Sequence, residues 1–582
     1  MKIQPRRCEQ VFSSEDAGVC LPLTQRVLAA RGITSATELQ YSLKQLHPVQ
    51  QLGSVQEAAA LLADAVQGGH PVLIVGDYDA DGATATALSM RALHMMGHAK
   101  ADYLVPDRFK YGYGLTPEIV ALAREHKEQP WLLMTVDNGV SSIEGVEAAK
   151  AAGYKTLITD HHLPGEQLPD CDVMVNPNLR DDAFPSKALA GVGVVFYVML
   201  ALKKELAARG HFAAQGLDEP NMTALLPLVA LGTVADVVPL DVNNRILVEQ
   251  GLRRIRAGYG QAGISALLDQ AGRNPQTVVS SDFGFVCGPR LNAAGRLADM
   301  SLGIRCLLTD DVMEARRLAY ELNQLNMERR RIEADMKEDA QAIIQALVLD
   351  QNVEPPPIMC LHQADWHEGV IGILASRIKD KHYRPVIVFA SAENGQVKGS
   401  ARSIPGLHMR DLIDEVASRN PGLILRFGGH AMAAGLTLME TDLDQFVAEI
   451  TDAVLRQLQP DTFREVVFTD GELETQDFDL VCAEQLRTIA PWGQWFPEPQ
   501  FEGGFLIVQK RVLKDAHMKL ELRPLLEDGS PAPLVVPGIQ FFADLERWPE
   551  PGEPVYLVYK LAVNEFRGER SLQLMVDILR DS

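Results

Sequence analysis

Apolar and polar residues alternate along the first half of the chain in an order that predicts strands followed by helices. Short apolar runs typical of buried strands occur at residues 72–75, 131–136, 156–159 and 173–176. Segments with helical periodicity lie at residues 57–67, 84–96, 143–152 and 190–208. This order predicts βαβ units and a parallel sheet. We therefore expect an α/β domain at 51–305, after a mixed N-terminal segment at 1–50.

The pattern changes twice after this domain. Residues 314–348 are helical without a glycine or proline, which predicts a helix about 50 Å long inside a connector at 306–354. Residues 355–460 begin with three prolines and again alternate helices and strands, so we expect a smaller α/β domain there. Strand-like runs dominate from 461 to 582, which predicts an all-β tail that forms a small barrel of the OB type.

Charge and cysteine content narrow the possible functions. The 582 residues carry a formal net charge of −22, which argues against non-specific binding of nucleic acid and leaves only a local groove for a polyanion. The seven cysteines form no C-x-x-C pair, so neither a zinc site nor a disulfide framework is predicted. The N-terminus lacks an apolar signal segment and no run reaches 18 apolar residues, so we expect a cytoplasmic protein.

Acidic residues and histidines follow several of the predicted strands of the first domain. They are Asp77, Asp79, Asp81, Asp137, Asp160, His161 and His162, and Asp236 follows later in the same domain. The carboxyl ends of parallel strands share one edge of a sheet, so we expect these side chains to converge. Crowded carboxylates repel one another unless cations lie between them, and oxygen ligands favour Mg²⁺ or Mn²⁺. Two such metals would activate a water and stabilise the charge on a phosphodiester. The motif Asp137-Asn-Gly, taken alone, is also typical of a turn.

These motifs resemble those of a known family. Asp77-x-Asp-x-Asp-Gly, Asp137-Asn-Gly, Asp160-His-His and Asp236 are similar, in this order, to the motifs of the DHH phosphoesterase superfamily. Residues 427–435 resemble the glycine-rich motif of the DHH-associated domain, and residues 288–296 and 366–377 resemble segments of its single-strand-specific exonucleases. The resemblance covers about residues 50–460. It implies a DHH domain, a DHH-associated substrate-binding domain and an OB-like tail.

The resemblance implies a role for each of five metal ligands. Asp79 and Asp81 would bind different metals, Asp137 would bridge the two metals, and His161 and Asp236 would complete the shell of one metal.

Three neighbouring positions are assigned less simply by the same resemblance. Many members of the superfamily carry a histidine four residues before the position of Asp79, where this chain has Val75. Asp77 is therefore an alternative ligand for the first metal. His162 would face the substrate, and Asp160 would orient a histidine from outside the metal shell.

Candidate substrate-binding residues lie in both predicted α/β domains. Ser400 and Arg402 resemble part of a pocket for a 5′-terminal phosphate, which a guanidinium grips through paired hydrogen bonds. Gly428, Gly429 and His430 resemble a phosphate-binding turn, but the same residues also fit a turn at the start of a helix. Arg108 is a second candidate for the 5′-phosphate pocket. Arg290 and Arg296 would either follow the DNA backbone or pair with acids, and Asn292 is a further candidate for substrate binding.

The resemblance implies a metal-dependent exonuclease that degrades single-stranded DNA from the 5′ end to mononucleotides, in recombination and repair. It also implies a monomer that works at the nucleoid with a single-strand-binding protein and a helicase. A DHH phosphoesterase that acts on short oligonucleotides or cyclic dinucleotides is the alternative, and a DNA-binding scaffold without metals is a second one. The long connector and the β tail favour a polymeric substrate, and the presence of every motif acid argues against the scaffold.

Overall fold

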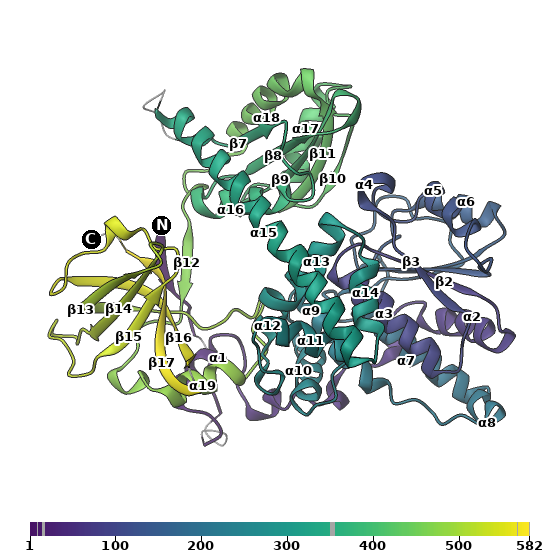
Figure 1. Cartoon of the computed structure of the whole chain (residues 1–582), viewed down its shortest axis with the longest axis horizontal. Coiled ribbons are helices and arrows are strands. Elements are labelled where there is room, and N and C mark those ends of the chain that lie inside the picture. Colours follow the sequence, from purple (N-terminus) through teal and green to yellow (C-terminus); the bar gives the residue numbers. More distant parts are fainter. Residues whose placement is uncertain (9, 14–17, 350–354, 567, 581–582) are drawn as a thin grey trace. The chain divides into compact units, whose positions relative to one another are not determined.

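The computed structural model describes residues 1–582 except 9, 14–17, 350–354, 567 and 581–582, and it leaves the side chains of 108–109 and 346–349 undescribed. The chain forms two compact units (Figure 1). The large unit contains residues 3–295, 299–323 and 468–582, and the small unit contains 1–2, 296–298 and 324–467. No helix among the described residues has both the length and the apolar character needed to span a membrane.

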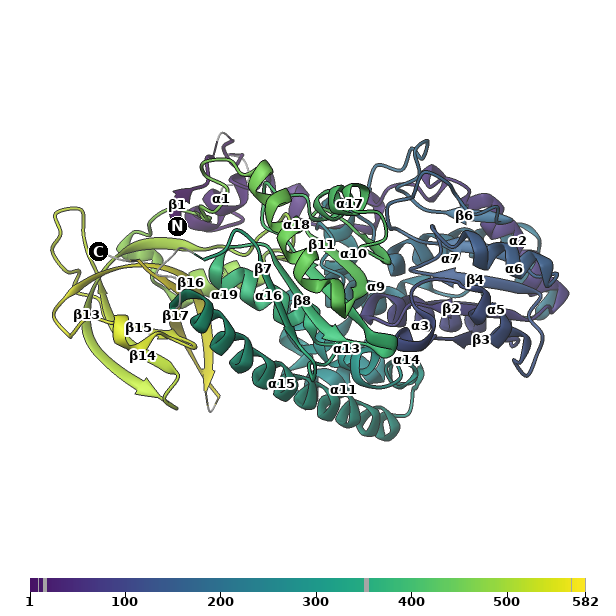
Figure 2. The same ribbon diagram turned by 90° about the horizontal axis from the view of Figure 1, so that it is seen from above.

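A five-stranded parallel sheet with the order β3-β2-β4-β5-β6 forms the core of the first part of the large unit. Figure 2 shows β4, β2 and β3 side by side. The register pairs Gly76 with Val136 and Val136 with Thr159, so three strands end at the same edge. The strands are β2 (Val72–Gly76), β3 (Ala101–Leu104), β4 (Leu132–Val136), β5 (Lys155–Thr159) and β6 (Val173–Val175).

Helices cover the sheet as the βαβ pattern predicts. Leu73 and Val75 of β2 pack with Ile119 of α5 (Pro117–Arg124) and Val146 of α6 (Ile143–Ala151) in one apolar cluster. Helices α3 (Ala80–Met95) and α7 (Gly191–Ala208) contact the strands and each other. The remaining helices before the connector are α1 (Pro22–Ala29), α2 (Val55–Gly68), α4 (Arg108–Tyr111), α8 (His211–Gln215), α9 (Leu226–Ala235), α10 (Val242–Arg256), α11 (Ala262–Gln270), α12 (Ser280–Asp282), the π-helix η7 (Phe283–Cys287), α13 (Gly288–Leu297) and α14 (Ser301–Leu308).

The helix predicted at 314–348 is α15 (Val312–Leu349), whose residues from Gln324 onward belong to the small unit. The small unit contains a mixed sheet with the order β10-β11-β9-β8-β7, in which only β7 and β8 are parallel. Its strands are β7 (Met359–Gln363), β8 (Val386–Ser391), β9 (Gln396–Arg402), β10 (Arg426–Gly429) and β11 (Ala433–Met439). Its helices are α16 (Ile371–His382), α17 (Met409–Arg419) and α18 (Leu443–Gln457).

The C-terminal part of the large unit contains a closed barrel, as the strand pattern predicts. Its strands are β13 (Phe501–Leu513), β14 (His517–Pro524), β15 (Val536–Gln540), β16 (Pro554–Phe566) and β17 (Glu569–Leu579). The expectation that the tail is entirely β is wrong, because α19 (Leu480–Thr488) precedes the barrel and buries Cys482 and Leu486. A two-stranded sheet pairs β1 (Lys2–Pro5) with β12 (Val466–Thr469), which lies between the small-unit helix α18 and the barrel in the sequence.

Candidate metal centre

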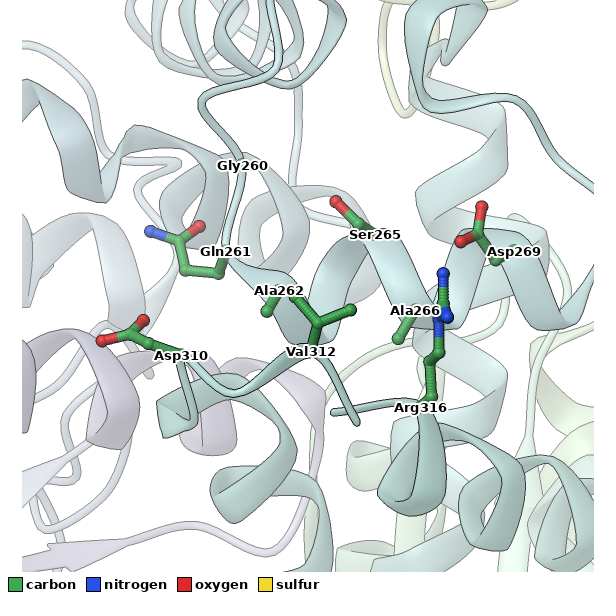
Figure 3. A pocket seen from close by; sticks show the side chains of 9 residues that line it. All are labelled: Gly260, Gln261, Ala262, Ser265, Ala266, Asp269, Asp310, Val312 and Arg316. Carbon is green, nitrogen blue, oxygen red and sulfur yellow. The ribbon is translucent and has the colours of Figure 1, made fainter. Parts of the chain in front are cut away.

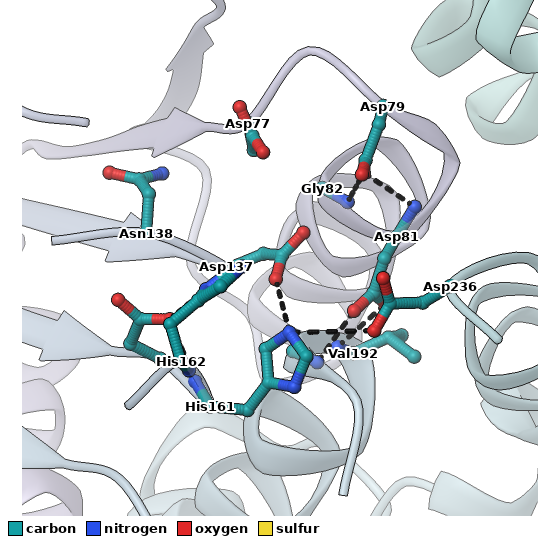
Figure 4. Close-up of polar contacts among 12 residues, drawn as sticks. Asp77, Asp79, Asp81, Gly82, Asp137, Asn138, His161, His162, Val192 and Asp236 are labelled. Atoms are coloured by element: carbon teal, nitrogen blue, oxygen red, sulfur yellow. Dashed lines mark hydrogen bonds and ion pairs between the residues drawn. The ribbon is translucent and has the colours of Figure 1, made fainter. Parts of the chain in front are cut away.

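The loop between β2 and α3 carries Asp77 and Asp79, and Asp81 follows in the first turn of α3 (Figure 4). Asp79 caps α3, because its Oδ1 accepts hydrogen bonds from the backbone N–H groups of Asp81 (2.9 Å) and Gly82 (3.0 Å). A side chain at Gly82 would lie 2.5 Å from the carbonyl oxygen of Asp77, so only glycine allows the loop to close this tightly. Asp77 is buried at the start of the loop and accepts from the N–H of Tyr78. The cap therefore fixes the direction of both neighbouring acids.

Asp81 is held by the N-terminus of a second helix. Its carboxylate accepts hydrogen bonds from the N–H groups of Gly191 (2.6 Å) and Val192 (3.0 Å), which are unpaired donors at the start of α7. A side chain at Gly191 would lie 2.6 Å from Cβ of Asp137. This glycine therefore lets the N-terminal end of α7 lie against both Asp81 and Asp137.

Asp137 follows β4 in a backbone conformation that is rare for a residue with a side chain. Its φ is 63°, in the left-handed region that aspartate tolerates better than most residues. The side chain is 2% exposed, and the backbone carbonyl accepts from the hydroxyl of Tyr113 at 3.2 Å. Asn138 supports the turn, since its side-chain amide donates to the carbonyls of Val75 and Val136. The turn therefore directs the Asp137 carboxylate inward at the sheet edge.

Asp160 organises the residues after β5. One oxygen accepts from the N–H of Val140, and the other accepts from the N–H groups of His161 and His162 and lies 2.7 Å from Nδ1 of His162. Burial opposes protonation of His162, but the hydrogen bond and charge of Asp160 outweigh it and raise the pKa of His162 to about 9. Asp160 thus holds the turn and keeps His162 cationic at neutral pH.

Asp236 reaches the site from a helix, whereas the other acids follow strands. It is the residue after α9, and its Oδ2 lies 3.5 Å from Nε2 of His161. The next residue, Val237, has a φ of 62°, which is an outlier for a β-branched residue. The sequence placed Asp236 in the site but did not indicate that it follows a helix.

The ligand atoms of these residues form three groups in which all atoms lie within 4.8 Å of one another. The groups, among the described residues, are Asp81, His161 and Asp236; Asp137, His161 and His162; and Asp77, Asp79 and Asp137. Asp137 therefore belongs to two of them, as a bridging ligand would. His161 belongs to the two groups that contain histidine.

The electrostatics of the site fit cations that bind there. Burial raises the pKa of Asp81 and of Asp137 well above the usual range, and the neighbouring acids raise it further. Burial also lowers the pKa of His161, so that its imidazole is neutral and free to act as a ligand. Oδ1 of Asp137 and Nε2 of His161 are buried 3.1 Å apart without an aligned hydrogen bond in the described structure. Buried polar atoms of this kind require a partner, and a divalent cation would provide one.

Val75 and Asp77 differ clearly in their environments. Val75 is 1% exposed and packs in the apolar cluster under α5 and α6. Asp77 lies with Asp79 and Asp137 in one of the three groups. The position of Val75 thus belongs to the core, whereas Asp77 lies beside Asp79 and Asp137, and its role as a metal ligand stays a prediction.

The predicted substrate residues of the large unit make hydrogen bonds within the protein. Arg290 is 8% exposed and donates to Oδ1 of Asn323 and to the carbonyl of Val286. Asn292 accepts from the N–H of Ala80 at 2.8 Å, so it supports the loop that carries Asp79. The side chain of Arg108 lies outside the described part of the chain. Their roles in substrate binding stay predictions.

The other predicted substrate residues belong to the small unit. Arg402 lies in β9, donates to Oγ of Ser400 at 3.2 Å and to the carbonyl of Ala401, and has a pKa lowered by burial. Gly428 and Gly429 end β10, and the N–H of His430 donates to the carbonyl of Ala433 in the turn to β11. The alternative that these glycines begin a helix is wrong, because they lead into a hairpin. Arg296 donates to the carbonyl of Gly369 at 3.0 Å.

Sequence reasoning missed several groups that build the site. The hydroxyl of Tyr113 contacts His162 and the backbone carbonyl of Asp137, and burial raises the pKa of Tyr113 well above the usual range. Asn176 and Asn178 donate to the carbonyls of His162 and His161. The Asn-Pro-Asn sequence directly after β6 was the available signal for this support. The backbone donors of α7 have no sequence signal of their own.

A pocket of about 430 Å³ lies elsewhere in the large unit (Figure 3). It is formed by the start of α11 and by residues 310–316, and it shares no residue with the acidic site.

Comparison with known families agrees with the three-part organisation. The model of the DHH family N-terminal domain matches residues 71–233, that of the DHHA1 domain matches 342–456, and that of the RecJ OB domain matches 469–577. The single-stranded-DNA-specific exonuclease RecJ of Dickeya dadantii is 50% identical over 96% of both chains. The same exonuclease of Escherichia coli is 48% identical over 99% of both chains. The chain belongs to the RecJ family.

Solved RecJ structures support the same assignment. RecJ from Thermus thermophilus in complex with Mn²⁺ superposes with a TM-score of 0.78 at 28% identity, over all of this chain and 80% of that one. An exonuclease RecJ bound to manganese matches with a TM-score of 0.58 at 34% identity, over 72% of this chain and 97% of that one. The α/β fold with a terminal OB barrel, predicted from the sequence, is therefore confirmed for this RecJ family member.

Proposed function

We propose that this chain is a metal-dependent exonuclease that degrades single-stranded DNA in the 5′→3′ direction to mononucleotides, in recombination and repair. The observation that carries the proposal is the convergence of six ligands at one sheet edge in a chain about half identical, over its whole length, to exonucleases of this specificity. The 5′ polarity and the mononucleotide product come from the family resemblance.

Two divalent cations, Mg²⁺ or Mn²⁺, would be held by Asp77, Asp79, Asp81, Asp137, His161 and Asp236. When bound, they would supply charge neutralisation for the phosphodiester and activation of the attacking water. The chain positions these ligands through the α3 cap, the α7 N-terminus and the Asp160 turn. His162, protonated at neutral pH, is placed to donate a hydrogen bond to an oxygen of the substrate phosphate.

The small unit would bind the 5′ end of the strand. Ser400 and Arg402 lie on one strand with their polar groups together, which supports a pocket for a terminal phosphate. Gly429 has a φ of 141° and lies before His430 in the β10–β11 turn, where backbone N–H groups and the imidazole would donate to phosphate. Arg108, Arg290, Asn292 and Arg296 complete the proposed set.

The cellular setting is part of the proposal. We keep the domain boundaries inferred from the sequence, with the catalytic domain at 51–305, the connector at 306–354, the substrate-binding domain at 355–460 and the barrel at 461–582. A monomer that acts in the cytoplasm, at the nucleoid, would receive its strand from a helicase and from a single-strand-binding protein. The barrel would hold DNA that has not yet been cleaved.

Strands labelled at one end test this function and its alternative together. The wild-type chain is incubated with 5′-labelled and 3′-labelled single strands, a duplex, a dinucleotide and a cyclic dinucleotide, each with Mg²⁺ and with Mn²⁺. We expect labelled mononucleotide at once from the 5′-labelled strand, slowly shortening products from the 3′-labelled strand, and no digestion of the duplex. Faster turnover of the dinucleotides than of the long strand would support the small-substrate phosphoesterase instead.

A further inference from the structure

The segment Trp492-Gly-Gln-Trp-Phe496 carries three aromatic side chains with opposite environments. Trp492 and Phe496 are 8% and 2% exposed and stack on each other with ring centroids 5.1 Å apart and an angle of 13°. The guanidinium of Arg31 lies 5.4 Å from the ring centroid of Trp492, and that of Arg245 lies 4.4 Å from that of Phe496. Trp495, between them, is 79% exposed. Two aromatics therefore anchor the segment, and the third is presented to solvent.

Hydrogen bonds fix this segment to the catalytic part of the large unit. The carbonyl of Trp492 accepts from Oγ of Ser280 at 2.8 Å, and the carbonyl of Gln494 accepts from the N–H of Leu240 at 2.8 Å. Gly493 and Phe496 exchange both backbone hydrogen bonds, which makes Gln494 and Trp495 the central residues of a tight turn. Leu240 comes four residues after the metal-site residue Asp236. These bonds tie the turn to the segment that follows Asp236 and to the start of α12.

The backbone of Trp495 shows that folding does not explain this residue. Its φ is 60°, at the third position of a turn where glycine or asparagine is usual. A large side chain there strains the backbone, and an exposed indole gains little from burial. Strained and exposed residues of this kind gather at functional sites. The turn therefore presents Trp495 at a cost to stability, for a purpose other than packing.

Two more exposed apolar residues lie on segments that border Asp236. Val237, the next residue, is 62% exposed and has a φ of 62°. Phe285 is 78% exposed in the π-helix η7, a form that is frequent at functional sites. That helix leads into Gly288, where an added Cβ would lie 3.1 Å from Cβ of Ala235, so α9 and this segment pack closely. Trp495, Val237 and Phe285 thus belong to three segments that bond to or pack against one another, and one of these segments contains Asp236.

We infer that Trp495, with Phe285 and Val237, forms a stacking surface for bases of the single strand beside the scissile phosphate. The inference rests on the proposed function. The chain has a net charge of −22 and gathers acids at this site, so a contact that does not depend on charge would add to the affinity for a strand. Stacking does not depend on charge and accepts every base, which suits an enzyme that must degrade any sequence. Continuity with the metal site favours the strand as the occupant over a protein partner.

Abasic strands test the surface in the full-length protein. Single strands with a 5′ phosphate are prepared with one abasic site, moved from the second to the eighth nucleotide. The kcat/KM for release of the first nucleotide is measured for the wild type and for Trp495→Asn, because asparagine accepts the left-handed backbone but stacks poorly. We expect the wild type to lose about 5-fold to 100-fold at one or two positions of the abasic site. Trp495→Asn should lose as much on the intact strand and show no further loss at those positions.

Two control variants complete the design. Trp495→Phe should keep the positional profile of the wild type. Tyr259→Ala removes an aromatic side chain that is 75% exposed and follows the C-terminal end of α10, a helix about 22 Å long whose other end follows Leu240, and it should leave every rate unchanged. A Trp495→Asn profile equal to the wild-type profile would overturn the inference, and a protein partner on this surface predicts that result. A wild type that digests no strand would refute the proposed function, and the inference with it.

Discussion

Asp137→Asn is the substitution that most directly tests the bridging role. Asparagine keeps the shape of the side chain and accepts the left-handed backbone at a φ of 63°, so the turn after β4 should be preserved. It removes one negative charge from a side chain that is only 2% exposed. The substitution should therefore stabilise the folded protein when no metal is bound, and it should weaken the stabilisation that bound metal provides.

The size of the effect follows from the spacing of the acids. The ligand atoms of Asp77, Asp79 and Asp137 lie within 4.8 Å of one another. Two unit charges at that distance repel by about 3 kcal/mol at an effective dielectric constant of about 20. The raised pKa values of Asp137 and Asp81 mean that part of this repulsion is already relieved by protonation. We therefore expect the substitution to stabilise the metal-free protein by about 1 to 2 kcal/mol.

Thermal unfolding and nuclease assays measure both effects on the same samples. In the presence of a chelator, Asp137→Asn should unfold at a higher temperature than the wild type. Addition of Mn²⁺ should raise the unfolding temperature of the wild type clearly and that of the variant little, because binding to the folded state is lost. The nuclease rate should fall at least about 100-fold. A variant that is less stable without metal, or that keeps Mn²⁺-dependent cleavage, would refute the bridging assignment.

Three further substitutions test other parts of the proposal. Arg402→Ala should reduce the preference for a 5′-phosphorylated over a 5′-hydroxyl strand by about 10-fold or more, measured as a ratio of kcat/KM, whereas the exposed Arg410→Ala should not change it. Asp160→Asn should lower the pKa of His162 from about 9. A raised histidine pKa stabilises the folded state fully below about pH 6.5, and this contribution is lost as the pH rises toward 9. The difference in unfolding free energy between the wild type and Asp160→Asn should therefore become smaller over this pH range. A difference that stays constant in denaturant titrations would contradict the assignment. Val237→Gly should raise stability by about 0.5 to 1 kcal/mol through relief of its left-handed strain, and a lower unfolding midpoint would count against that strain.

The fold was predictable where one physical signal dominated. Buried strands such as β2 and β4 read as apolar runs, and the acids after them pointed to a shared edge. Strand β3 was missed because its sequence, Ala-Asp-Tyr-Leu, lies at the sheet edge and is partly polar. Asp236 was placed in the site through its motif alone, since no local pattern brings a helix end toward a sheet edge. The hydrogen bonds from α7 to Asp81 depend on tertiary packing, and backbone donors leave no mark in a sequence.

The contacts between the N-terminal residues and the residues before the barrel determine where this chain can be truncated. Arg31 and Asp470 form two hydrogen bonds, 2.6 and 2.9 Å long, and their side chains are each 2% exposed. Loss of one partner from such a buried pair costs about 3 to 5 kcal/mol. A chain truncated before Phe468 would therefore lose part of its own interior along with the barrel. Any smaller nuclease made from this protein would need a redesigned surface at Arg31 and Arg245, where Trp492 and Phe496 now pack.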